Sequence, residues 1–256
     1  GGEAQCAALA KLRGSVARLS FTPEGCRVVQ LAFQVAEISV AQELVEELQG
    51  HVRDALASPH ANYVLQVAIS TLPSRASALV ARELKGYGAF AARHRFGCRV
   101  LCRLVEHAGT SLELATLIEE VSAQVQELCR GSFSHYVVRS MLEHLPAHRA
   151  RIAEALHSEM AQLAQHRCAS HVVEAALLHC NEEDRRSLTL ELLGDDGLAA
   201  VEMLAQSQYG SFVLKALLRV PCKASEQAWG HLQRILPALD GNKHSQRMLK
   251  DLGLKS

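Results

Sequence analysis

The chain has 256 residues, of which 48% are apolar and 21% are charged, so it has enough apolar material for a folded core. No run of about 18 apolar residues occurs, and we expect no membrane span. The 27 Lys and Arg balance the 27 Asp and Glu. This balance excludes a protein that binds nucleic acid through bulk positive charge, but it leaves room for a locally basic face.

The eight cysteines are scattered through segments with helical patterns, which indicates reduced thiols rather than a disulfide framework. Cys98 and Cys102 lie four residues apart, but no second pair with metal-ligand spacing follows. We therefore expect neither a metal nor another cofactor. Ser170 and His171 are adjacent in sequence and cannot face each other on a helix. Because no phosphate-binding loop occurs either, the sequence predicts that the protein is not an enzyme.

Residues 1–14 are expected to form the end of a preceding repeat or an N-terminal cap. Residues 7–12 resemble the last helix of a preceding unit, and Gly14 recurs as Gly50 and Gly86 at steps of 36. Glycine directly after a helix suits its C-terminal cap. The chain starts without Met, so we expect its N-terminus to be a fragment boundary, at which targeting signals cannot be judged.

A five-residue motif recurs six times after residue 14. Its best-formed copy is Asn62-Tyr63-Val64-Leu65-Gln66, which has a polar residue at each end and an apolar pair inside. The first positions follow one another at steps of 36, 36, 37, 35 and 41. The pair is Val-Val or Val-Leu in every copy, and a small residue precedes each copy. A fixed period with a constant apolar pair is the signature of a repeat protein.

Each repeat is expected to contain three helices. The first carries apolar residues ten and seven positions before the motif, with Gly88 as the exception at the first of these. The second helix starts at the motif, and the third is amphipathic. Pro73, Pro146 and Asn181 are turn-forming residues that separate second helices from third helices.

The six predicted repeats span residues 15–50, 51–86, 87–123, 124–158, 159–196 and 197–236. The step of 41 residues indicates a loop insertion near residues 194–197. Residues 237–256 are expected to be a C-terminal capping segment, whose last helix starts at residues 241–244 and carries no polar pair that matches the motif. One repeat cannot bury its own apolar faces, but stacked repeats can. The sequence therefore predicts an all-α solenoid that forms one continuous, curved domain with the second helices along one side.

The polar positions of the motif are expected to form a ridge on each second helix. Residues four apart share one face of a helix, so the first and fifth positions point the same way, and the second lies beside them. Amides carry paired donors and acceptors, and a ring can stack, which together favour recognition of a flat heterocycle. The alternative is that the ridge is an ordinary solvated helix surface.

The repeat resembles that of the Pumilio (PUF) family of RNA-binding proteins over about residues 15–256. The resemblance is carried by Asn-Tyr-x-x-Gln at residues 62–66, Cys-Arg-x-x-Gln at 26–30 and Ser-x-x-x-Glu at 170–174, each at the start of a second helix. Residues 241–249 are similar to the family's C-terminal Gly-Lys-His ending, although Asn242 interrupts it. Family members typically have eight repeats. Here there are six and a cap, so either upstream repeats are absent from this chain or the protein is a short member.

The resemblance implies a right-handed α-solenoid, a curved superhelix in which each repeat reads one base of single-stranded RNA that runs antiparallel to the chain. The first and fifth motif positions would meet the base edge, and the second would stack between bases. The implied base-edge pairs are Cys26 with Gln30, Asn62 with Gln66, Cys98 with Cys102, His135 with Arg139, Ser170 with Glu174, and Ser211 with Lys215. The implied stacking residues are Arg27, Tyr63, Arg99, Tyr136, His171 and Phe212.

Three pairs have side-chain chemistry that predicts a base. The Asn–Gln pair of the second repeat complements the donor and acceptors of uracil, and the Cys–Gln pair of the first suits the N1 acceptor and N6 donor of adenine. Glu174 only accepts hydrogen bonds when it is ionised, and guanine presents N1–H and N2–H donors. The pair in the fifth repeat therefore implies guanine.

The other three pairs depart from the family's common ones. Cys98 with Cys102 lacks an amide, which leaves a weak preference for adenine. His135 with Arg139 replaces acceptors by donors, which favours cytosine with its N3 and O2 acceptors. Lys215 also ends in a donor and fits a phosphate or a cytosine. The predicted RNA, from 5′ to 3′, is a base that the sequence does not assign, then G, C, A, U and A.

The function that these observations favour is sequence-selective binding of single-stranded RNA, for post-transcriptional regulation of mRNA through its 3′ untranslated region. The resemblance implies a monomer in the cytoplasm that represses or destabilises mRNA with the help of co-repressor proteins on the convex face. One alternative is a Pumilio-like factor of ribosome assembly in the nucleolus, with little preference for RNA sequence. Another is an α-solenoid scaffold that binds protein in its groove.

Overall fold

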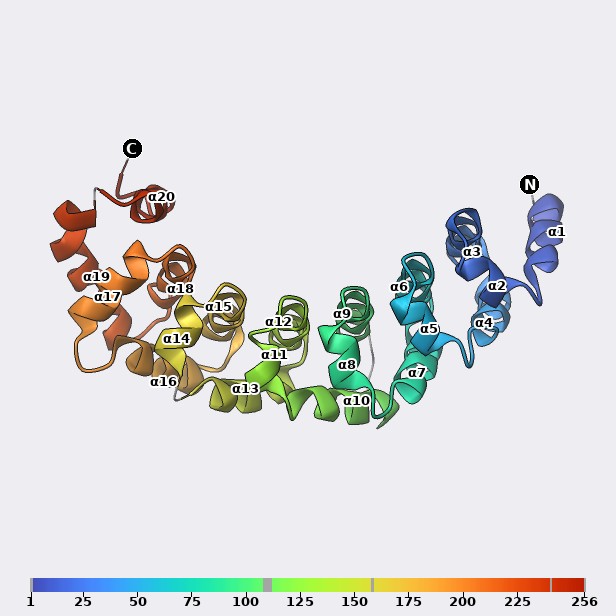
Figure 1. Ribbon diagram of the computed structural model, residues 1–256, viewed down its shortest axis with the longest axis horizontal. Helices are drawn as coiled ribbons and strands as arrows, with labels where there is room; N and C mark the ends of the chain where they lie inside the picture. The colour runs from blue at the N-terminus through green and yellow to red at the C-terminus, as the bar shows by residue number, and fades with distance from the viewer. Residues whose placement is uncertain (1, 108–111, 158, 240, 256) are drawn as a thin grey trace. The chain divides into compact units, whose positions relative to one another are not determined.

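The structure, a computed structural model, describes residues 2–107, 112–157, 159–239 and 241–255. Every regular element in these ranges is a helix (Figure 1), and none of these helices is both long and apolar enough to cross a membrane. The helices divide into two compact units, residues 1–124 (unit 1) and 125–256 (unit 2). We expected one continuous domain. Each repeat of a stack packs mainly on its neighbours, so compact units within such a chain follow from local contacts.

Unit 1 consists of an N-terminal helix, α1 (Gly2–Leu12), and three repeats. The first repeat contains α2 (Val16–Ser20), α3 (Pro23–Val35) and α4 (Ile38–Glu46). The second contains α5 (Val52–Ala57), α6 (Ala61–Thr71) and α7 (Pro73–Glu83). The third contains α8 (Gly88–Arg93), α9 (Gly97–His107) and α10 (Leu112–Ser122).

Unit 2 consists of three repeats and a C-terminal segment. The fourth repeat contains α11 (Val125–Leu128), α12 (Ser134–His144), the 3-10 turn η1 (Pro146–His148) and α13 (Arg149–Leu156). The fifth contains α14 (Met160–Gln165), α15 (Ala169–His179) and α16 (Glu182–Leu193), and the sixth contains α17 (Gly197–Gln206), α18 (Gly210–Leu217) and α19 (Lys223–Ile235). The 3-10 turn η2 (Leu236–Leu239) and α20 (Lys243–Asp251) end the chain.

Local capping signals determine where several helices begin. The Thr22 hydroxyl accepts a hydrogen bond of 3.1 Å from a backbone N–H three residues on, at the start of α3, and Pro23 occupies the first helical position. Pro73 opens α7 in the same way. The side chain of Asn181 accepts a hydrogen bond of 2.8 Å from the N–H of Asp184 and starts α16. Two of the residues expected to separate helices thus also start third helices.

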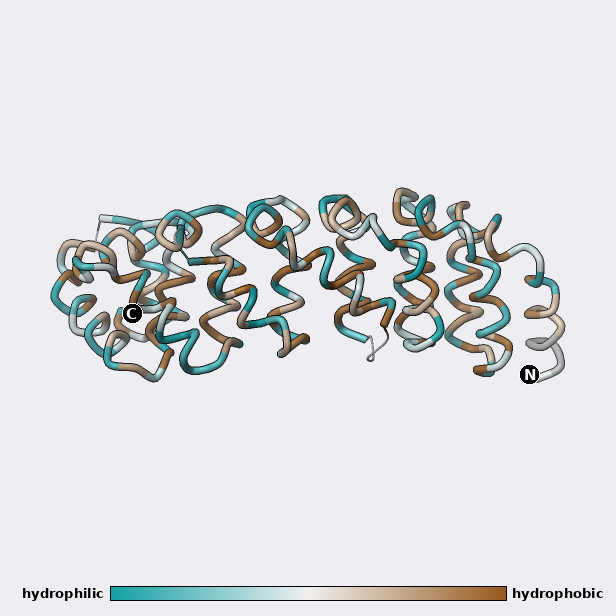
Figure 2. The backbone as a smooth tube through the Cα atoms, turned by 90° about the horizontal axis from the view of Figure 1, so that it is seen from below, coloured by the Kyte–Doolittle hydropathy of each residue, from teal (hydrophilic) through white to brown (hydrophobic). Residues whose placement is uncertain are grey.

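The apolar pair of the motif forms the core between second helices. In unit 1, α3 packs on α6 and α6 on α9; in unit 2, α12 packs on α15 and α15 on α18. Val64 and Leu65 are 0% and 1% exposed, and apolar and polar stretches alternate along the helices (Figure 2). Val28 occupies the same motif position in α3 as Val64 does in α6, but it is 49% exposed. The reason is that the described chain contains no preceding repeat whose second helix could pack on α3.

In each repeat of unit 1, a carboxylate from the third-helix region accepts hydrogen bonds from backbone N–H groups at the start of that same repeat. Glu83, at the end of α7, accepts hydrogen bonds from the backbone N–H groups of Gly50 (2.6 Å) and Val52 (3.2 Å). Gly50 has a φ of 80°, a conformation that glycine adopts without strain. Glu47 binds the N–H groups of residues 14 and 16, and Glu120 those of residues 86 and 88, in the same way. We call this arrangement the junction clasp.

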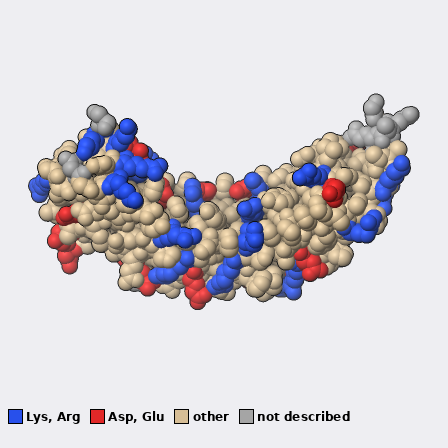
Figure 3. Space-filling model, turned by 45° about the horizontal axis from the view of Figure 1, so that its top comes forward, with Lys and Arg blue, Asp and Glu red and all other residues tan. Residues whose placement is uncertain are grey.

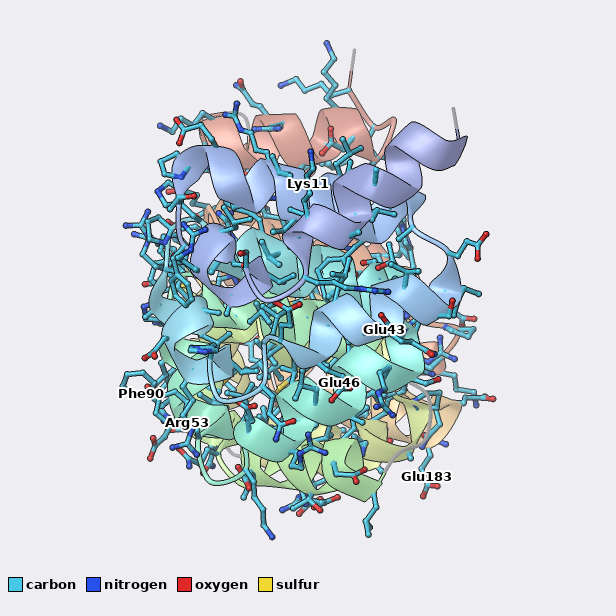
Figure 4. The ribbon with its side chains drawn as sticks, turned by 90° about the vertical axis from the view of Figure 1, so that its right-hand side faces the viewer. Lys11, Glu43, Glu46, Arg53, Phe90 and Glu183 are labelled. Atoms are coloured by element: carbon cyan, nitrogen blue, oxygen red, sulfur yellow. The ribbon has the colours of Figure 1, made fainter. Side chains whose placement is uncertain are left out.

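Side chains on the first helices reinforce the same junctions. Arg53 of α5 donates a hydrogen bond to the backbone carbonyl of Glu83 (2.9 Å), and its guanidinium lies 5.2 Å from the centre of the Tyr87 ring. Figure 4 shows Arg53 and Phe90 on one side of unit 1, away from Glu43 and Glu46 of α4. The first and third helices thus form different sides of the unit.

Gly88 breaks the apolar pattern of the first helices for a steric reason. A Cβ atom at this position would lie 2.8 Å from Cδ1 of Leu117. A side chain at this position would therefore require the side chain of Leu117 on α10 to move. The exception in the sequence pattern is therefore a close contact between two helices of one repeat.

The extra residues of the sixth repeat lengthen a helix. The first helix of this repeat, α17, has 10 residues, whereas α14 of the preceding repeat has 6. The carboxylate of Asp196 accepts a hydrogen bond of 3.0 Å from the N–H of Ala199 and so starts α17 early. The loop insertion expected near residues 194–197 is corrected to a short connection followed by an additional helical turn.

Candidate functional site

The second helices present one accessible ridge each. Tyr63 and Tyr136, at the second position of the motif, are 43% and 52% exposed. The other predicted stacking residues are exposed (Arg27, Arg99) or half-buried (His171, Phe212). The fifth-position residues are exposed (Arg139) or half-buried (Gln30, Gln66, Cys102, Glu174, Lys215). Unit 1 brings together the ridges of α3, α6 and α9, and unit 2 those of α12, α15 and α18.

The first-position residues lie deeper than the motif alone suggests. All six are buried, with exposed fractions between 0% and 6% (Cys26, Asn62, Cys98, His135, Ser170, Ser211). Several donate a hydrogen bond back to the preceding turn of the chain: Cys26 Sγ to the Pro23 carbonyl (3.3 Å), and Ser211 Oγ to the Gln208 carbonyl (3.3 Å). Because their hydrogens are used in this way, these side chains offer lone pairs to a ligand.

Asn62 shows this arrangement most clearly. Its amide nitrogen donates to the Ser58 carbonyl (2.8 Å), and its oxygen accepts from Nε2 of Gln66 (3.0 Å). Asn62 is 0% exposed, whereas Gln66 is half-buried. The Asn–Gln pair predicted to face a base is therefore present, with Gln66 as the outer member and Asn62 as its internal support.

His135 has the opposite hydrogen-bonding character from the one expected. Its Nδ1 lies 2.8 Å from the Gly131 carbonyl. Since a carbonyl only accepts, Nδ1 must carry the proton, and in the neutral ring Nε2 is an acceptor. Burial lowers the pKa of His135, and the neighbouring His171 and Arg139 lower it further, against the raising effect of the Gly131 hydrogen bond. The expectation that both His135 and Arg139 are donors is corrected: this pair offers one acceptor and one cationic donor.

The fifth repeat places a carboxylate next to an imidazole. Ser170 is 2% exposed, Glu174 is half-buried, and the Glu174 carboxylate lies 3.9 Å from Nδ1 of His171. The ring of His171 also stacks on that of His135, with centroids 5.7 Å apart and planes 22° from parallel. An acceptor-only group, when it is ionised, thus stands beside a flat ring.

In the first and sixth repeats, the fifth-position residues are already engaged. Gln30 donates from Nε2 to the Cys26 carbonyl (3.0 Å), which leaves its amide oxygen for other partners. Lys215 pairs with Asp251 of α20 (2.6 Å) and lies 4.7 Å from the centre of the Phe212 ring. The predicted donor of the sixth repeat is therefore part of an ion pair with the C-terminal segment.

Stacking side chains of neighbouring repeats contact one another across one repeat step. Arg99 on α9 donates from Nη1 to the Tyr63 hydroxyl on α6 at 3.5 Å. The contact shows that neighbouring second positions lie near enough for both to touch one flat ligand.

Sequence reasoning missed a seventh ridge on α20. The buried residues Met248 (1% exposed) and Leu249 (2% exposed) take the place of the apolar pair, and the small, buried Ser245 precedes the motif. Gln246, Arg247 and Lys250 then occupy the first, second and fifth positions, and all three are exposed. The expectation that the last helix has no matching polar pair is thereby corrected. The signal was the 35-residue step from Ser211 to Gln246, which Met-Leu in place of Val-Leu concealed.

The cysteines of the ridges form no metal site among the described residues, where no group of three or more His, Cys, Asp or Glu side chains could hold an ion. Burial raises the pKa of the Cys98 thiol. The seven cysteines whose side chains are described are all free. Cys98 and Cys102 are thus both free thiols on the second helix of the third repeat.

These features define a class of protein: an α-solenoid of three-helix repeats whose second helices each carry a stacking side chain beside a polar one. A model of the Pumilio-family RNA binding repeat matches residues 15–49, 92–122, 124–157 and 159–193, which together exceed half of the chain. The chain belongs to the Pumilio family of RNA-binding repeat proteins. The family inferred from the motifs is thereby confirmed, and this family is one of RNA-binding repeats rather than of enzymes.

Individual relatives agree with this assignment. The chain is 27% identical over 205 residues to Pumilio homolog 9 of Arabidopsis thaliana, which covers 79% of this chain and 35% of that protein. It is 25% identical over 230 residues to Fem-3 mRNA-binding factor 1 of Caenorhabditis elegans, covering 78% and 37%. The chain thus spans about a third of the length of these curated relatives.

Solved structures confirm the α-solenoid fold. The Puf3 RNA binding domain bound to Cox17 RNA 3′ UTR recognition sequence site B has a TM-score of 0.82 to this chain at 21% identity, and the match covers 94% of this chain and 74% of that one. PUF-8 in complex with PBE-RNA also has a TM-score of 0.82, at 18% identity, covering 94% and 72%. At these identities the likeness concerns the fold.

Proposed function

We propose that the protein binds single-stranded RNA with sequence selectivity, one base per repeat, along the ridges of its second helices. The observation that carries this proposal is the repeated pairing of an accessible second-position side chain with an accessible fifth-position polar group, on helices that stack on one another within each unit. Flat side chains hold a base by its face, and polar groups select it by its edge.

The fifth positions select the base in this proposal, and the buried first positions support them. In unit 1, Gln66 reads uracil with Asn62 behind it, and Gln30 reads adenine. In unit 2, Glu174 reads guanine. Arg139 donates to N3 or O2 of cytosine while Nε2 of His135 accepts from N4–H, so cytosine remains the base proposed for the fourth repeat.

The RNA is proposed to run antiparallel to the chain, with its 5′ end at unit 2. An mRNA is the proposed target, and a relative named for binding mRNA and a Puf3 domain bound to a 3′ UTR sequence support this choice. Regulation of that mRNA in the cytoplasm, by a monomer that recruits co-repressors, extends the proposal to the whole protein. The chain has no net formal charge, so we expect binding to depend on base contacts more than on bulk electrostatics.

Selection from a random single-stranded RNA pool, followed by titration of the selected sequence at fixed salt, tests the proposal. We expect enrichment of a short motif with G upstream of U-A. Glu174→Gln should relax the preference for G at that position alone, because the amide adds a donor where guanine presents donors. Glu182→Gln, at an exposed residue of α16, makes the same charge change away from the ridge and should leave the motif intact.

The other outcomes separate the alternatives. RNA binding without any enriched motif would favour a ribosome-assembly factor with little sequence preference. An absence of RNA binding would overturn the proposal and leave a protein-binding scaffold.

A further inference from the structure

The last helix of unit 2 carries a cluster of positively charged side chains, although the chain as a whole has no net charge. Residues 243–256 contain Lys243, Arg247, Lys250 and Lys255 but one carboxylate, Asp251. That carboxylate is paired with Lys215 at 2.6 Å, so it does not neutralise the cations of its own helix completely. Figure 3 shows the Lys and Arg side chains gathered at the C-terminal end of unit 2.

The helix that carries these cations is firmly attached. It packs on α17 and α18, and Ser245 donates from Oγ to the Ala205 carbonyl (2.9 Å). Asn242 caps the start of α20 and also donates from Nδ2 to the Gln206 carbonyl (3.0 Å). Because α20 is held at both its start and its buried face, the helix has a defined position beside the sixth repeat.

The cations continue the line of the reading positions. Arg247 occupies the second position, one step beyond Phe212, and Lys250 occupies the fifth, one step beyond Lys215. A hollow between α18 and α20 is lined by Phe212, Lys215 and Arg247, among others. An RNA strand that passes over the sixth repeat would therefore meet α20 next.

We propose that the exposed cations of α20, Lys243, Arg247 and Lys250, bind the phosphates of the RNA strand on the 5′ side of the segment that the six repeats read. The ligand class is a phosphodiester backbone, recognised without regard to base. This inference rests on the proposed function, including its strand direction. Lys243 and Lys250 form no ion pair with any residue that the structure describes, so both are open to a phosphate.

The side-chain chemistry favours a phosphate over a base. Lysine and arginine only donate hydrogen bonds and stay charged, and a phosphate only accepts and is charged oppositely. A base edge instead combines donors with acceptors. Each phosphate that a protein neutralises on a single strand changes the slope of log K against log salt by about 0.7. Three cations should therefore add about 2 to this slope.

Titration with RNAs that differ only in their ends tests the inference. The core RNA is the motif obtained by selection, and two derivatives carry three abasic nucleotides at either the 5′ or the 3′ end. We expect the 5′ extension alone to tighten binding. Its advantage should fall about 16-fold between 50 and 200 mM salt, as an added slope of about 2 requires. Abasic nucleotides supply phosphates without bases, so a gain from them cannot come from base recognition.

Two triple variants provide the matched comparison. Lys243→Gln/Arg247→Gln/Lys250→Gln should lose the gain from the 5′ extension and keep the base preference for the core RNA. Arg186→Gln/Lys223→Gln/Arg234→Gln removes three exposed cations from the third helices α16 and α19 and should keep the gain. Unchanged thermal unfolding of the α20 variant establishes that its effect on binding is not a loss of folding.

The remaining outcomes overturn the inference in distinguishable ways. An equal gain from the 5′ and 3′ extensions, or an unchanged gain in the α20 variant, contradicts a phosphate site on this helix. A gain from natural nucleotides but not from abasic ones would indicate a base site instead. Failure of the wild-type chain to select any core motif would be a failure of the proposed function, not of this inference alone.

Discussion

Gln66 donates a hydrogen bond of 3.0 Å to the side-chain oxygen of Asn62 and covers it, so that the two amides act as an outer and an inner member of one pair. The inner amide is 0% exposed and is also bound to the Ser58 carbonyl. A single sequence motif therefore contains one residue that a ligand can reach and one that holds the helix turn together.

Substitutions at these two positions should have different effects. Asn62→Ala removes one buried and one partly buried hydrogen bond and should lower the free energy of unfolding by about 1–3 kcal/mol. Gln66→Ala removes a half-exposed amide and one of these two hydrogen bonds, so it should lower the free energy of unfolding by less than Asn62→Ala does, but it should weaken binding to RNA with uracil at the matching position. Urea denaturation and RNA titration measure the two effects. Equal losses of stability in both variants would contradict the inner and outer roles.

The pH dependence of stability should carry a contribution from His135. Its pKa is lowered in the folded state, mainly by burial, so the unfolded chain takes up this proton first as the pH falls. The contribution is fully present above the unfolded value of about 6.5 and is lost as the pH falls towards the lowered folded value. The slope in that window is at most about 1.4 kcal/mol per pH unit.

His135→Gln isolates this contribution from those of the other histidines. The difference in unfolding free energy between wild type and variant, measured by urea denaturation from pH 8 to pH 5, should fall on the acid side. A difference that stays constant across this range would show that burial of His135 does not disfavour its protonation. The same protonation converts Nε2 from acceptor to donor, so the base preference of the fourth repeat should also change in acid.

The exposure of Val28 gives a matched pair of substitutions in equivalent positions. Val64→Asp places a charge in a site that is 0% exposed and should lower the free energy of unfolding by more than about 3 kcal/mol. Val28→Asp changes a residue that is 49% exposed and should cost less than about 1 kcal/mol. Thermal or urea unfolding of this 256-residue chain distinguishes them. A large loss from Val28→Asp would mean that another part of the chain covers α3.

The junction clasp should make a measurable contribution to stability. Glu83→Ala leaves the N–H groups of Gly50 and Val52 without their carboxylate, and we expect a loss of about 1–3 kcal/mol. Glu113→Ala removes an exposed carboxylate from α10 and should change stability by less than about 0.5 kcal/mol. Urea denaturation measures both. Similar small changes in the two variants would show that water replaces the clasp without cost.

The sequence predicted the fold well because its strongest signal is also the main physical cause. The Val-Val or Val-Leu pair recurs at the period of the stack and is the part of each second helix that its neighbours bury. The start of α7 and α16 at Pro73 and Asn181 likewise follows from local chemistry. These features depend on residues close together in sequence, so no knowledge of the tertiary structure was needed.

The parts of the site that the sequence did not predict depend on contacts between distant residues. The motif places Asn62 and Gln66 on one face, but only packing decides that one is buried and the other accessible. The tautomer of His135 depends on the Gly131 carbonyl, and the role of Glu83 on N–H groups more than 30 residues away. The sequence did not predict a motif position for Arg247, because Met248 stands where the motif has valine. The RNA contacts of all these residues stay predictions.

The junction clasp also means that a whole repeat of unit 1 could be removed and an equivalent junction would form. If residues 51–86 were excised, Glu120 would meet the N–H groups of Gly50 and Gly88 in place of those of Gly86 and Gly88. Gly50 and Gly86 have φ values of 80° and 75°, so the new junction would have the backbone shape of the old one. If each repeat binds one base, as we propose, a shortened chain of this kind should recognise an RNA site that is one base shorter and otherwise unchanged.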